Sequence, residues 1–522
     1  MINRSLKSSI FILVFIAILI VTLLNVFYIS NISMGEVSSS EYLGLEKAII
    51  TFIIICEVFI LCYLANKIKI PKTLKIVLII LSIILYAVIQ IMWINTSLMT
   101  PRADSKEILE IAKCITGNTK WTQDIFNYIE YYPQQLTLAT IIAIIFKIFN
   151  TTDYILIQYI NVIFNIFTFL GLYFILKKLS KKYEINEVLF FMLTLTFIPL
   201  IMLVTYVYGD IMGLALSIWG VYFAIKYVET NKIRYAIITG LLLSFSYLLR
   251  MNYIIFFIAI IIYWIINYID IKKEKIKQTI KILFVTILSI LIILIPSKLI
   301  KDAFFEEHNL SKENSFSIVP YLYMGMSESE TGNGWYSIEI ENIVQKIINS
   351  NTEQSNQIKE ETRELLNERI EYFIQNPIYA INFYKNKLIS TWAEPSMAYN
   401  FYNKLYEGDI NKEENPVLYS MLYGEIYEET KLYQKALNLL IFAGTLITIF
   451  QNRKKLDKEI MLLCLIFLGG FGFHLLWETK SRYILPYVII IIPVACIGIT
   501  NLFNKLTEKL KKDKLDIELK WD

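Results

Sequence analysis

Long apolar runs recur along this chain of 522 residues, and they constrain its fold more than any other feature. A run of about 18 residues or more is long enough for a helix to cross the hydrocarbon core of a bilayer, which is about 30 Å thick. The composition agrees, because 56% of the residues are hydrophobic and 18% are charged. An average soluble domain is about 45–50% apolar and about 25% charged. The sequence therefore predicts an all-α polytopic membrane protein.

We expect about twelve membrane-spanning helices and one further apolar helix that does not cross. The expected spans are residues 10–29, 48–66, 75–97, 154–176, 187–207, 210–226, 235–251, 253–270, 279–299, 434–451, 459–477 and 483–503. With a cytoplasmic N-terminus, every basic cluster between spans falls on the cytoplasmic side only if the run 132–149 stays on the outer face. We therefore predict a juxtamembrane or re-entrant helix there, and cytoplasmic termini.

This topology divides the chain into membrane segments and outer parts. The expected parts are a three-span segment (1–97), an outer catalytic loop with its juxtamembrane helix (98–153), central transmembrane helices (154–299), a mostly helical extracytoplasmic domain (300–432), a C-terminal three-span segment (433–503) and a basic cytoplasmic tail (504–522). We call residues 300–432 the outer domain. Within it, an amphipathic helix should begin after Asn376-Pro377, end near Trp392 and suit the membrane surface.

The first substantial polar segment, residues 101–135, is the place where chemistry is expected. It contains acids and aromatic residues between apolar runs: Asp104, Glu107, Glu110, Asp124, Glu130, Trp121, Tyr128, Tyr131 and Tyr132. In the predicted topology three polar turns lie on the same outer side, at residues 206–210, 249–252 and 477–483. We call residues 477–483 the late loop.

Other classes of site are disfavoured by residue type. The five cysteines show no disulfide framework or metal-ligand spacing, and only two histidines occur. Basic residues cluster in short loops, which is the pattern of membrane orientation, so we expect no nucleic-acid partner. The Ile-, Lys- and Asn-rich usage suggests a bacterial protein, and hence the plasma membrane.

Short motifs in these outer segments carry a family resemblance. They are Arg102-Ala-Asp104, Tyr131-Tyr-Pro133, Tyr208-Gly-Asp210, Leu249-Arg250, and Glu478 with Arg482-Tyr483 before the last span. Together they resemble the GT-C fold glycosyltransferases, above all the dolichyl-phosphate-mannose protein mannosyltransferases and their aminoarabinose-transferase-like bacterial relatives. The chain departs from that pattern in an extra pair of N-terminal spans. It also has Ser105 where the family often has a second acid.

The resemblance implies transfer of one sugar from a polyprenyl-phosphate donor to a glycan, lipid or protein acceptor at the outer face. An acceptor hydroxyl needs a carboxylate to take its proton, and Asp104 is the candidate base. A phosphate needs cations, for which Arg250, Arg482 and Lys480 are the candidates. The candidates for substrate contact are Arg102, Glu130, Tyr131, Tyr132, Tyr208, Asp210 and Glu478. Metal-using relatives carry an Asp-x-Asp motif that this loop lacks, so a divalent metal is possible but not favoured.

Several alternatives remain open on sequence alone. Asp104 could simply cap the helix that follows it, and Arg250 could snorkel from a span end. Glu478, Lys480 and Arg482 could neutralise one another at the surface, and the tyrosines of the first loop could form an interfacial belt. A multi-span transporter or lipid flippase is a competing function, although the spans are largely uninterrupted and polar residues gather at one face. An envelope-polymer polymerase or ligase is a third.

Overall fold

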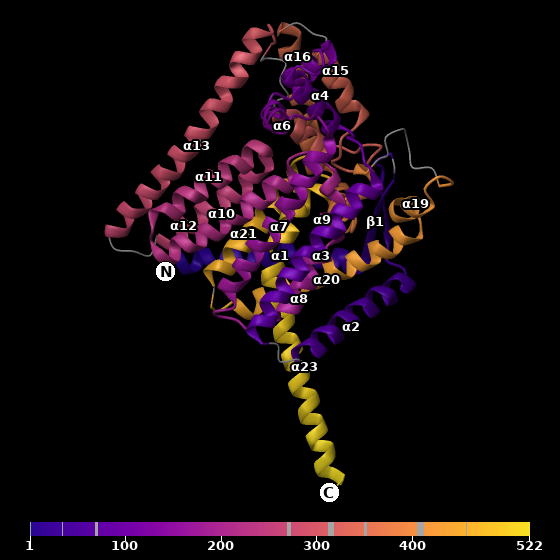
Figure 1. The fold of residues 1–522 in the computed structure, drawn as a ribbon, viewed down its shortest axis with the longest axis vertical. Coiled ribbons are helices and arrows are strands. Elements are labelled where there is room, and N and C mark those ends of the chain that lie inside the picture. Colours follow the sequence, from indigo (N-terminus) through magenta and orange to yellow (C-terminus); the bar gives the residue numbers. More distant parts are fainter. Residues whose placement is uncertain are drawn as a thin grey trace.

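Helices follow the apolar runs in the computed structural model, which describes residues 2–33, 35–67, 71–268, 273–311, 318–348, 352–403, 412–455 and 457–521 (Figure 1). The first three are α1 (Ile2–Phe27), α2 (Leu45–Lys67) and α3 (Lys72–Ser97). A helix satisfies its backbone hydrogen bonds internally, which is why an apolar run that enters lipid takes this form. The all-α prediction therefore holds for the main architecture.

A two-stranded hairpin between α1 and α2 was not predicted. Strands β1 (Tyr28–Ile32) and β2 (Ser38–Tyr42) pair antiparallel, with Ser30 opposite Ser40. The turn between them contains Glu36, which has a positive φ of 64°. Ser30 donates its backbone N–H to Ala393 O in the outer domain, at 3.0 Å. The hairpin thus joins the C-terminal end of α1 to the outer domain.

Short helices replace the expected loop after α3. They are α4 (Asp104–Thr116), α5 (Gln123–Tyr131) and α6 (Gln135–Phe149), followed by the long α7 (Tyr154–Leu179). Helix α6 has 15 residues, fewer than the roughly 20 that a span needs. It packs against α4, α11 and α13. Its length agrees with a helix that does not cross, and its placement on the outer face stays a prediction.

Two of the polar turns, at residues 206–210 and 249–252, lie at the ends of the central helices. These helices are α8 (Glu187–Leu195), α9 (Ile198–Met202), η1 (Leu203–Thr205), α10 (Asp210–Thr230), α11 (Ile233–Leu249), η2 (Met251–Tyr253), α12 (Ile254–Tyr268) and α13 (Lys273–Glu307). Helix α8 and the α9–η1 pair meet at an angle of 46°. Pro199 lies at this break, where its ring suits the first turn of a new helix.

The described residues of the outer domain are mostly helical, and their position outside the membrane stays a prediction. Its helices are α14 (Ile318–Met326), α15 (Ile338–Ile348), α16 (Thr352–Gln375), α17 (Pro377–Trp392), α18 (Tyr399–Tyr402) and α19 (Pro416–Tyr423). The bounds of α17 confirm the helix expected from Asn376-Pro377 to Trp392. Helix α15 packs against α5 and α16, and these helices lie near α4 at the top of Figure 1. The outer domain therefore covers the first polar segment.

The C-terminal helices complete the bundle. They are α20 (Glu425–Asn452), α21 (Lys458–Leu476), η4 (Ser481–Ile484), α22 (Leu485–Ile490) and α23 (Ile492–Trp521). Helix α20 packs against α1 and α23, and α23 then projects to the C-terminus, in yellow in Figure 1. Among the described residues, seven helices are long and apolar enough to cross a membrane, or nine if two bent pairs count. A polytopic chain is confirmed, and twelve spans stay a prediction.

Candidate active site

A cavity of about 670 Å³ lies where several parts of the chain meet, including Gln135 at the start of α6 and Tyr208 of the turn before α10. Its other walls come from the β1–β2 turn, the α4–α5 region, the outer domain and the late loop. Its described lining includes six carboxylate side chains: Glu36, Asp104, Glu107, Asp124, Glu341 and Glu478. The lysines of that lining are Lys106 and Lys480. We call this space the carboxylate cavity.

Asp104 is placed in this cavity by the start of α4. The N-cap residue of α4 is Ala103, with φ of 50°, and Asp104 is the first helical residue. The interpretation of Asp104 as the helix cap is therefore wrong. Its Oδ1 accepts a hydrogen bond from Tyr128 Oη at 3.3 Å. The half-buried carboxylate thus faces the cavity, at a helix end whose dipole favours negative charge.

The tyrosines of α5 form the adjoining wall. Tyr128, Tyr131 and Tyr132 all line the carboxylate cavity. The rings of Tyr131 and Tyr132 meet edge to face, with centroids 4.6 Å apart. Burial, and then the charge of Asp104, hold the pKa of Tyr128 well above its usual value. Tyr128 therefore keeps its proton and donates toward Asp104.

Three of the predicted substrate contacts, Arg102, Glu130 and Asp210, lie outside the lining of the carboxylate cavity. Arg102 Nη1 donates to Phe401 O at 2.6 Å, and its guanidinium lies 4.1 Å from the centre of the Phe401 ring. Glu130 Oε1 accepts the backbone N–H of Ser311 at 2.6 Å. These contacts join the first loop to neighbouring segments, so the structure does not bring Arg102 and Glu130 to the cavity.

Asp210 holds two arginines in one buried cluster. Arg250 Nε lies 2.7 Å from Asp210 Oδ1, and Arg482 Nη1 pairs with the other carboxylate oxygen. The side chains of Arg250 and Asp210 are each 12% exposed, and that of Arg482 is 2% exposed. Arg250 therefore pairs with a carboxylate in the protein interior, and snorkelling does not explain its position.

Aromatic rings surround the two guanidinium groups. Arg250 lies 4.4 Å from the centre of the Tyr208 ring. Arg482 lies 4.3 Å from the Tyr402 ring and 4.7 Å from the Tyr206 ring. Cations are attracted to such ring faces, most strongly where water is excluded. The cluster is thereby fixed in position while its charge is retained.

The turn before α10 depends on a glycine. Gly209 has φ of +80°, and a Cβ there would lie 2.4 Å from Leu249 O. Glycine is the residue that adopts this conformation readily and allows such a close approach. It lets the turn with Tyr208 and Asp210 pack directly on the end of α11, where Arg250 follows.

A second cavity of about 370 Å³ adjoins the first and contains Arg250. Most of its lining is apolar or aromatic, including Leu248, Ile254, Ile318, Phe473 and Trp477. We call it the arginine cavity. Five residues line both cavities: Gln135, Tyr208, Tyr321, Glu478 and Tyr483. The cavity on one side of this shared wall is therefore rich in carboxylates. The cavity on the other side combines the Arg250 guanidinium with apolar surface.

The late loop lines both cavities with Glu478 and Tyr483, and Lys480 lines the carboxylate cavity alone. Lys480 Nζ pairs with Glu36 Oε1 at 2.7 Å, whereas Arg482 pairs with Asp210. Glu478 is 9% exposed, and its Oε1 accepts from Tyr483 Oη at 3.3 Å. Burial raises the pKa of Glu478, as does the charge of Asp104, while Lys480 opposes the shift. The idea that the loop charges only neutralise one another at the surface is wrong.

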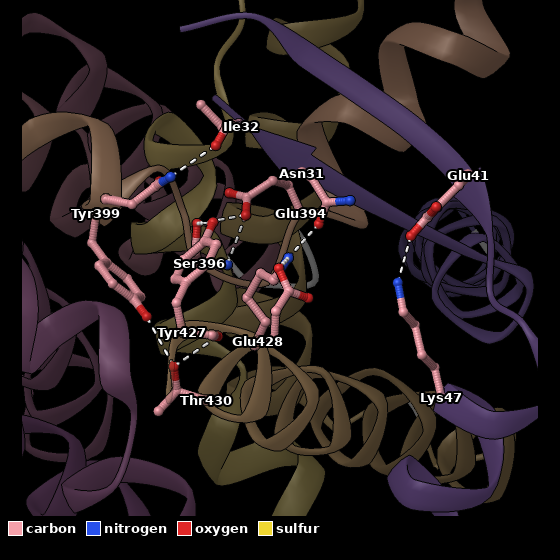
Figure 2. A network of polar contacts seen from close by, with 12 residues as sticks. Asn31, Ile32, Glu41, Lys47, Glu394, Ser396, Tyr399, Tyr427, Glu428 and Thr430 are labelled. Carbon is pink, nitrogen blue, oxygen red and sulfur yellow. Dashed lines mark hydrogen bonds and ion pairs between the residues drawn. The ribbon is translucent and has the colours of Figure 1, made fainter. Parts of the chain in front are cut away.

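Glu36 was missed by sequence reasoning because it lies in a short polar turn far from every motif. Figure 2 shows contacts that the hairpin makes with other parts of the chain at Asn31 and Ile32. Lys431 Nζ donates to Asn31 Oδ1 at 2.5 Å, and Asn400 Nδ2 donates to Ile32 O at 2.7 Å. Only the fold brings Glu36 to Lys480.

Lys387 of α17 was also missed. It is 1% exposed, and its Nζ donates to Gly325 O at 2.5 Å and to Leu475 O and Trp477 O at 2.9 Å each. Burial lowers its pKa to about 7, against a smaller opposing effect of Glu478. Lys387 thus ties the outer domain to the end of α21, immediately before Glu478.

The late loop is packed closely on this side. A Cβ at Gly325 would lie 2.2 Å from Leu476 O, and Thr479 donates its backbone N–H to Gly334 O at 2.9 Å. These contacts fix the backbone on both sides of Glu478. In the described part of the chain, no three His, Cys, Asp or Glu side chains are grouped so as to hold a metal ion.

Comparison with known proteins confirms the family resemblance in the central segment. Residues 135–298 match the family model of the dolichyl-phosphate-mannose-protein mannosyltransferases. This segment runs from α6 into α13 and includes Tyr208, Asp210 and Arg250. No curated protein matches the chain significantly.

Two solved structures of an archaeal oligosaccharyltransferase from Archaeoglobus fulgidus are similar to the chain. The complex with an inhibitory peptide and a dolichol-phosphate has a TM-score of 0.43 and 12% identity, and covers 83% of this chain and 51% of the other. The apo form has a TM-score of 0.40 and 10% identity, and covers 83% and 52%. This chain therefore spans about half the length of these enzymes.

Proposed function

We propose that this chain, whose central segment matches the dolichyl-phosphate-mannose-protein mannosyltransferases, is an integral-membrane glycosyltransferase. It moves a single sugar from a polyprenyl-phosphate donor to an acceptor at the outer face of the plasma membrane. The observation that carries the proposal is the wall shared by the carboxylate cavity and the arginine cavity. One cavity suits a lipid phosphate, and the other suits a hydroxylated substrate.

The donor occupies the arginine cavity in this proposal. Its lining offers apolar surface to the polyprenyl chain and the guanidinium of Arg250 to the phosphate. An adjoining cavity of about 340 Å³ shares Tyr247 and Leu248 with it and continues toward Lys298 and Lys301 of α13. Arginine suits phosphate because its planar fork donates two parallel charge-assisted hydrogen bonds. Arg482 and Lys480 add positive charge from the late loop.

The sugar and the acceptor meet in the carboxylate cavity. Asp104 takes the proton of the acceptor hydroxyl as that oxygen attacks the anomeric carbon. The bond from the anomeric carbon to the phosphate oxygen breaks, and the polyprenyl phosphate leaves with the electron pair. Arg250 stabilises the charge that develops on this leaving group. Glu478 and Tyr208 lie in the shared wall, where they contact the sugar hydroxyls.

Contacts of the late loop and the outer domain hold Arg250, Arg482 and Glu478 in fixed positions. Asp210 holds the guanidinium groups of Arg250 and Arg482 before the donor arrives, so little reorganisation is needed during the reaction. Lys387 fixes the carbonyl of Trp477 next to Glu478. The acceptor in this proposal is a glycan, a lipid or a protein. Sugar nucleotides stay in the cytoplasm, so the sugar reaches the outer face only on its lipid carrier.

The test is a transfer assay with the full chain in proteoliposomes. Polyprenyl-phosphate hexoses labelled in the sugar are supplied, with solubilised membranes of the source cell as acceptor. We expect label to move to acceptor with release of polyprenyl phosphate, and no transfer from a nucleotide sugar in the absence of lipid carrier. Movement of intact donor across the bilayer without transfer would contradict the proposal and indicate a flippase.

A further inference from the structure

An apolar groove lies between the first transmembrane helix and the outer domain, apart from both cavities of the site. It has a volume of about 370 Å³. Ile20 and Leu24 of α1 form one side, and Ile381 and Leu388 of α17 form part of the other. Lys385 of α17 contributes a charged side chain to the lining. The groove is thus apolar along its length, with a cation from the outer domain beside it.

Large apolar side chains project from the junction of α16 and α17. Ile374, Ile378 and Ile381 are 75%, 77% and 69% exposed. Ile378 and Ile381 are three residues apart and therefore share a face of α17. The opposite face of the helix packs into the outer domain through Phe383 and Lys387, which are both 1% exposed. A cluster of exposed isoleucines of this kind indicates a surface that contacts protein or lipid.

The contacts of α17 with α1 set its depth. Asn25 of α1 donates to Trp392 O at 2.9 Å, so the end of α17 lies near the outer end of α1. Helices α1 and α17 are in contact, and Ile20 and Ile381 line the same groove. Ile20 is seven residues before Phe27, where α1 ends, or about 10 Å at 1.5 Å per residue. Helix α1 is long and apolar enough to cross a bilayer, and a bilayer that it crosses would have the groove at the level of its lipid chains.

We propose that the first half of α17 lies in the outer leaflet, and that the groove binds an acyl chain of a phospholipid whose anionic headgroup pairs with Lys385. The groove continues the lipid-facing surface of α1, on which Leu23 and Phe27 are 46% and 55% exposed. Lysine at this level extends its ammonium toward the headgroups. The outer domain is thereby anchored in the membrane, independently of the proposed transfer reaction.

Site-directed spin labelling tests the proposal on the full chain in vesicles of phosphatidylcholine and phosphatidylglycerol. A nitroxide is attached to Ile381→Cys in a variant whose five native cysteines are replaced. Collisions with oxygen report lipid, and collisions with a water-soluble nickel chelate report water. Leu23→Cys on α1 is the lipid control, and Glu360→Cys, whose side chain is 64% exposed, is the water control.

We expect the label at residue 381 to behave like the label at residue 23, about 5–10 Å below the phosphates. Accessibility to the nickel chelate like that at residue 360 would overturn the proposal. Protection from both reagents would also overturn it, because that result indicates a second copy of the chain on the groove. If the cysteine-free variant fails to fold, Ile381→Trp in the native background gives the same decision through quenching by brominated phospholipids.

The role of Lys385 is tested separately with Lys385→Gln. With Lys385 present, we expect phosphatidylglycerol to immobilise the label at residue 381 more than phosphatidylcholine alone does. We expect the Lys385→Gln variant to show no such difference between the two lipid compositions. An unchanged response to phosphatidylglycerol would overturn the assignment of the headgroup to Lys385. Both measurements are independent of sugar transfer, so their failure would leave the proposed function unaffected.

Discussion

The two cavities that share a wall differ in how they hold their charges. In the carboxylate cavity, acids from four parts of the chain surround open space, and Asp104 has a tyrosine hydroxyl as its neighbour. Beside the arginine cavity, Arg250 and Arg482 are bound to one carboxylate and packed on aromatic rings. In the proposed reaction, the first arrangement leaves the Asp104 carboxylate available as the base, and the second fixes Arg250 in place for the leaving group.

The stability of the protein should therefore depend on Asp210, the carboxylate that Arg250 and Arg482 share. Asp210→Asn leaves two buried guanidinium groups without a charged partner, which we expect to cost about 3–5 kcal/mol of stability. Thermal unfolding in detergent measures the effect as a lower melting temperature. The control is Glu360→Gln, which breaks an exposed pair with Arg363 and should cost at most about 1 kcal/mol. Equal losses would show that the arginine cluster is not held by Asp210.

The geometry of Arg250 should matter beyond its charge. Arg250→Lys keeps a cation but loses the planar fork that contacts Asp210 and the Tyr208 ring. We expect kcat/KM for the lipid donor to fall about 10²–10³-fold, as on loss of one oriented donor to developing charge. Arg102→Lys, which changes an arginine outside both cavity linings, should have a much smaller effect. Full activity of Arg250→Lys would remove Arg250 from donor binding.

Alanine substitutions at two glycines with nearly the same φ distinguish the cost of a steric clash from the cost of a left-handed backbone. Gly209 has φ of +80° beside the arginines, and Gly117 has φ of +81° at the end of α4. A Cβ would meet Leu249 O at Gly209, whereas nothing lies within 4 Å at Gly117. We expect Gly117→Ala to cost about 1–2 kcal/mol for the left-handed conformation alone, and Gly209→Ala to cost clearly more. Equal changes in melting temperature would contradict the close approach of the turn to α11.

A pH dependence should come from Lys387, which supports the shared wall. Its pKa in the folded protein is about 7, below the usual lysine value of 10.5. Between these values the unfolded chain holds a proton that the folded chain has released, so stability rises as pH increases through this window. The gain is at most about 1.4 kcal/mol per pH unit. Melting temperatures of the wild type between pH 7 and 9 should rise relative to Lys387→Met, and parallel curves would contradict this.

The parts of the fold that depend on local pattern were predictable. The apolar runs predicted helices, and Asn376-Pro377 predicted the start of α17, because proline suits the first turn of a helix. The β1–β2 hairpin was missed because its short polar strands carry no strong alternating pattern. The count of spans was harder, since α6, α11 and α12 are shorter than a full crossing.

The candidate site was predictable in its members but not in its pairings. Asp104, Asp210, Arg250 and Arg482 were each named from the motifs that carry the family resemblance, and their roles stay predictions. Asp210 and Arg482 are 272 residues apart in sequence, so their contact comes only from the fold. Glu36 and Lys387 carried no signal, because a polar turn and an amphipathic helix contain such residues for ordinary reasons. Arg102 and Glu130 had the right chemistry, but their side chains contact other segments.

The division between a reacting carboxylate and a fixed donor site is tested most directly with Asp104→Asn. Transfer of labelled sugar and binding of polyprenyl phosphate are measured on the same proteoliposomes, with Asp124→Asn as a control at another acid of the same cavity. We predict that Asp104→Asn lowers transfer about 10²–10⁴-fold while polyprenyl phosphate binds as in the wild type, and that Asp124→Asn stays close to wild type. Transfer by Asp104→Asn at the wild-type rate would contradict the assignment of the base.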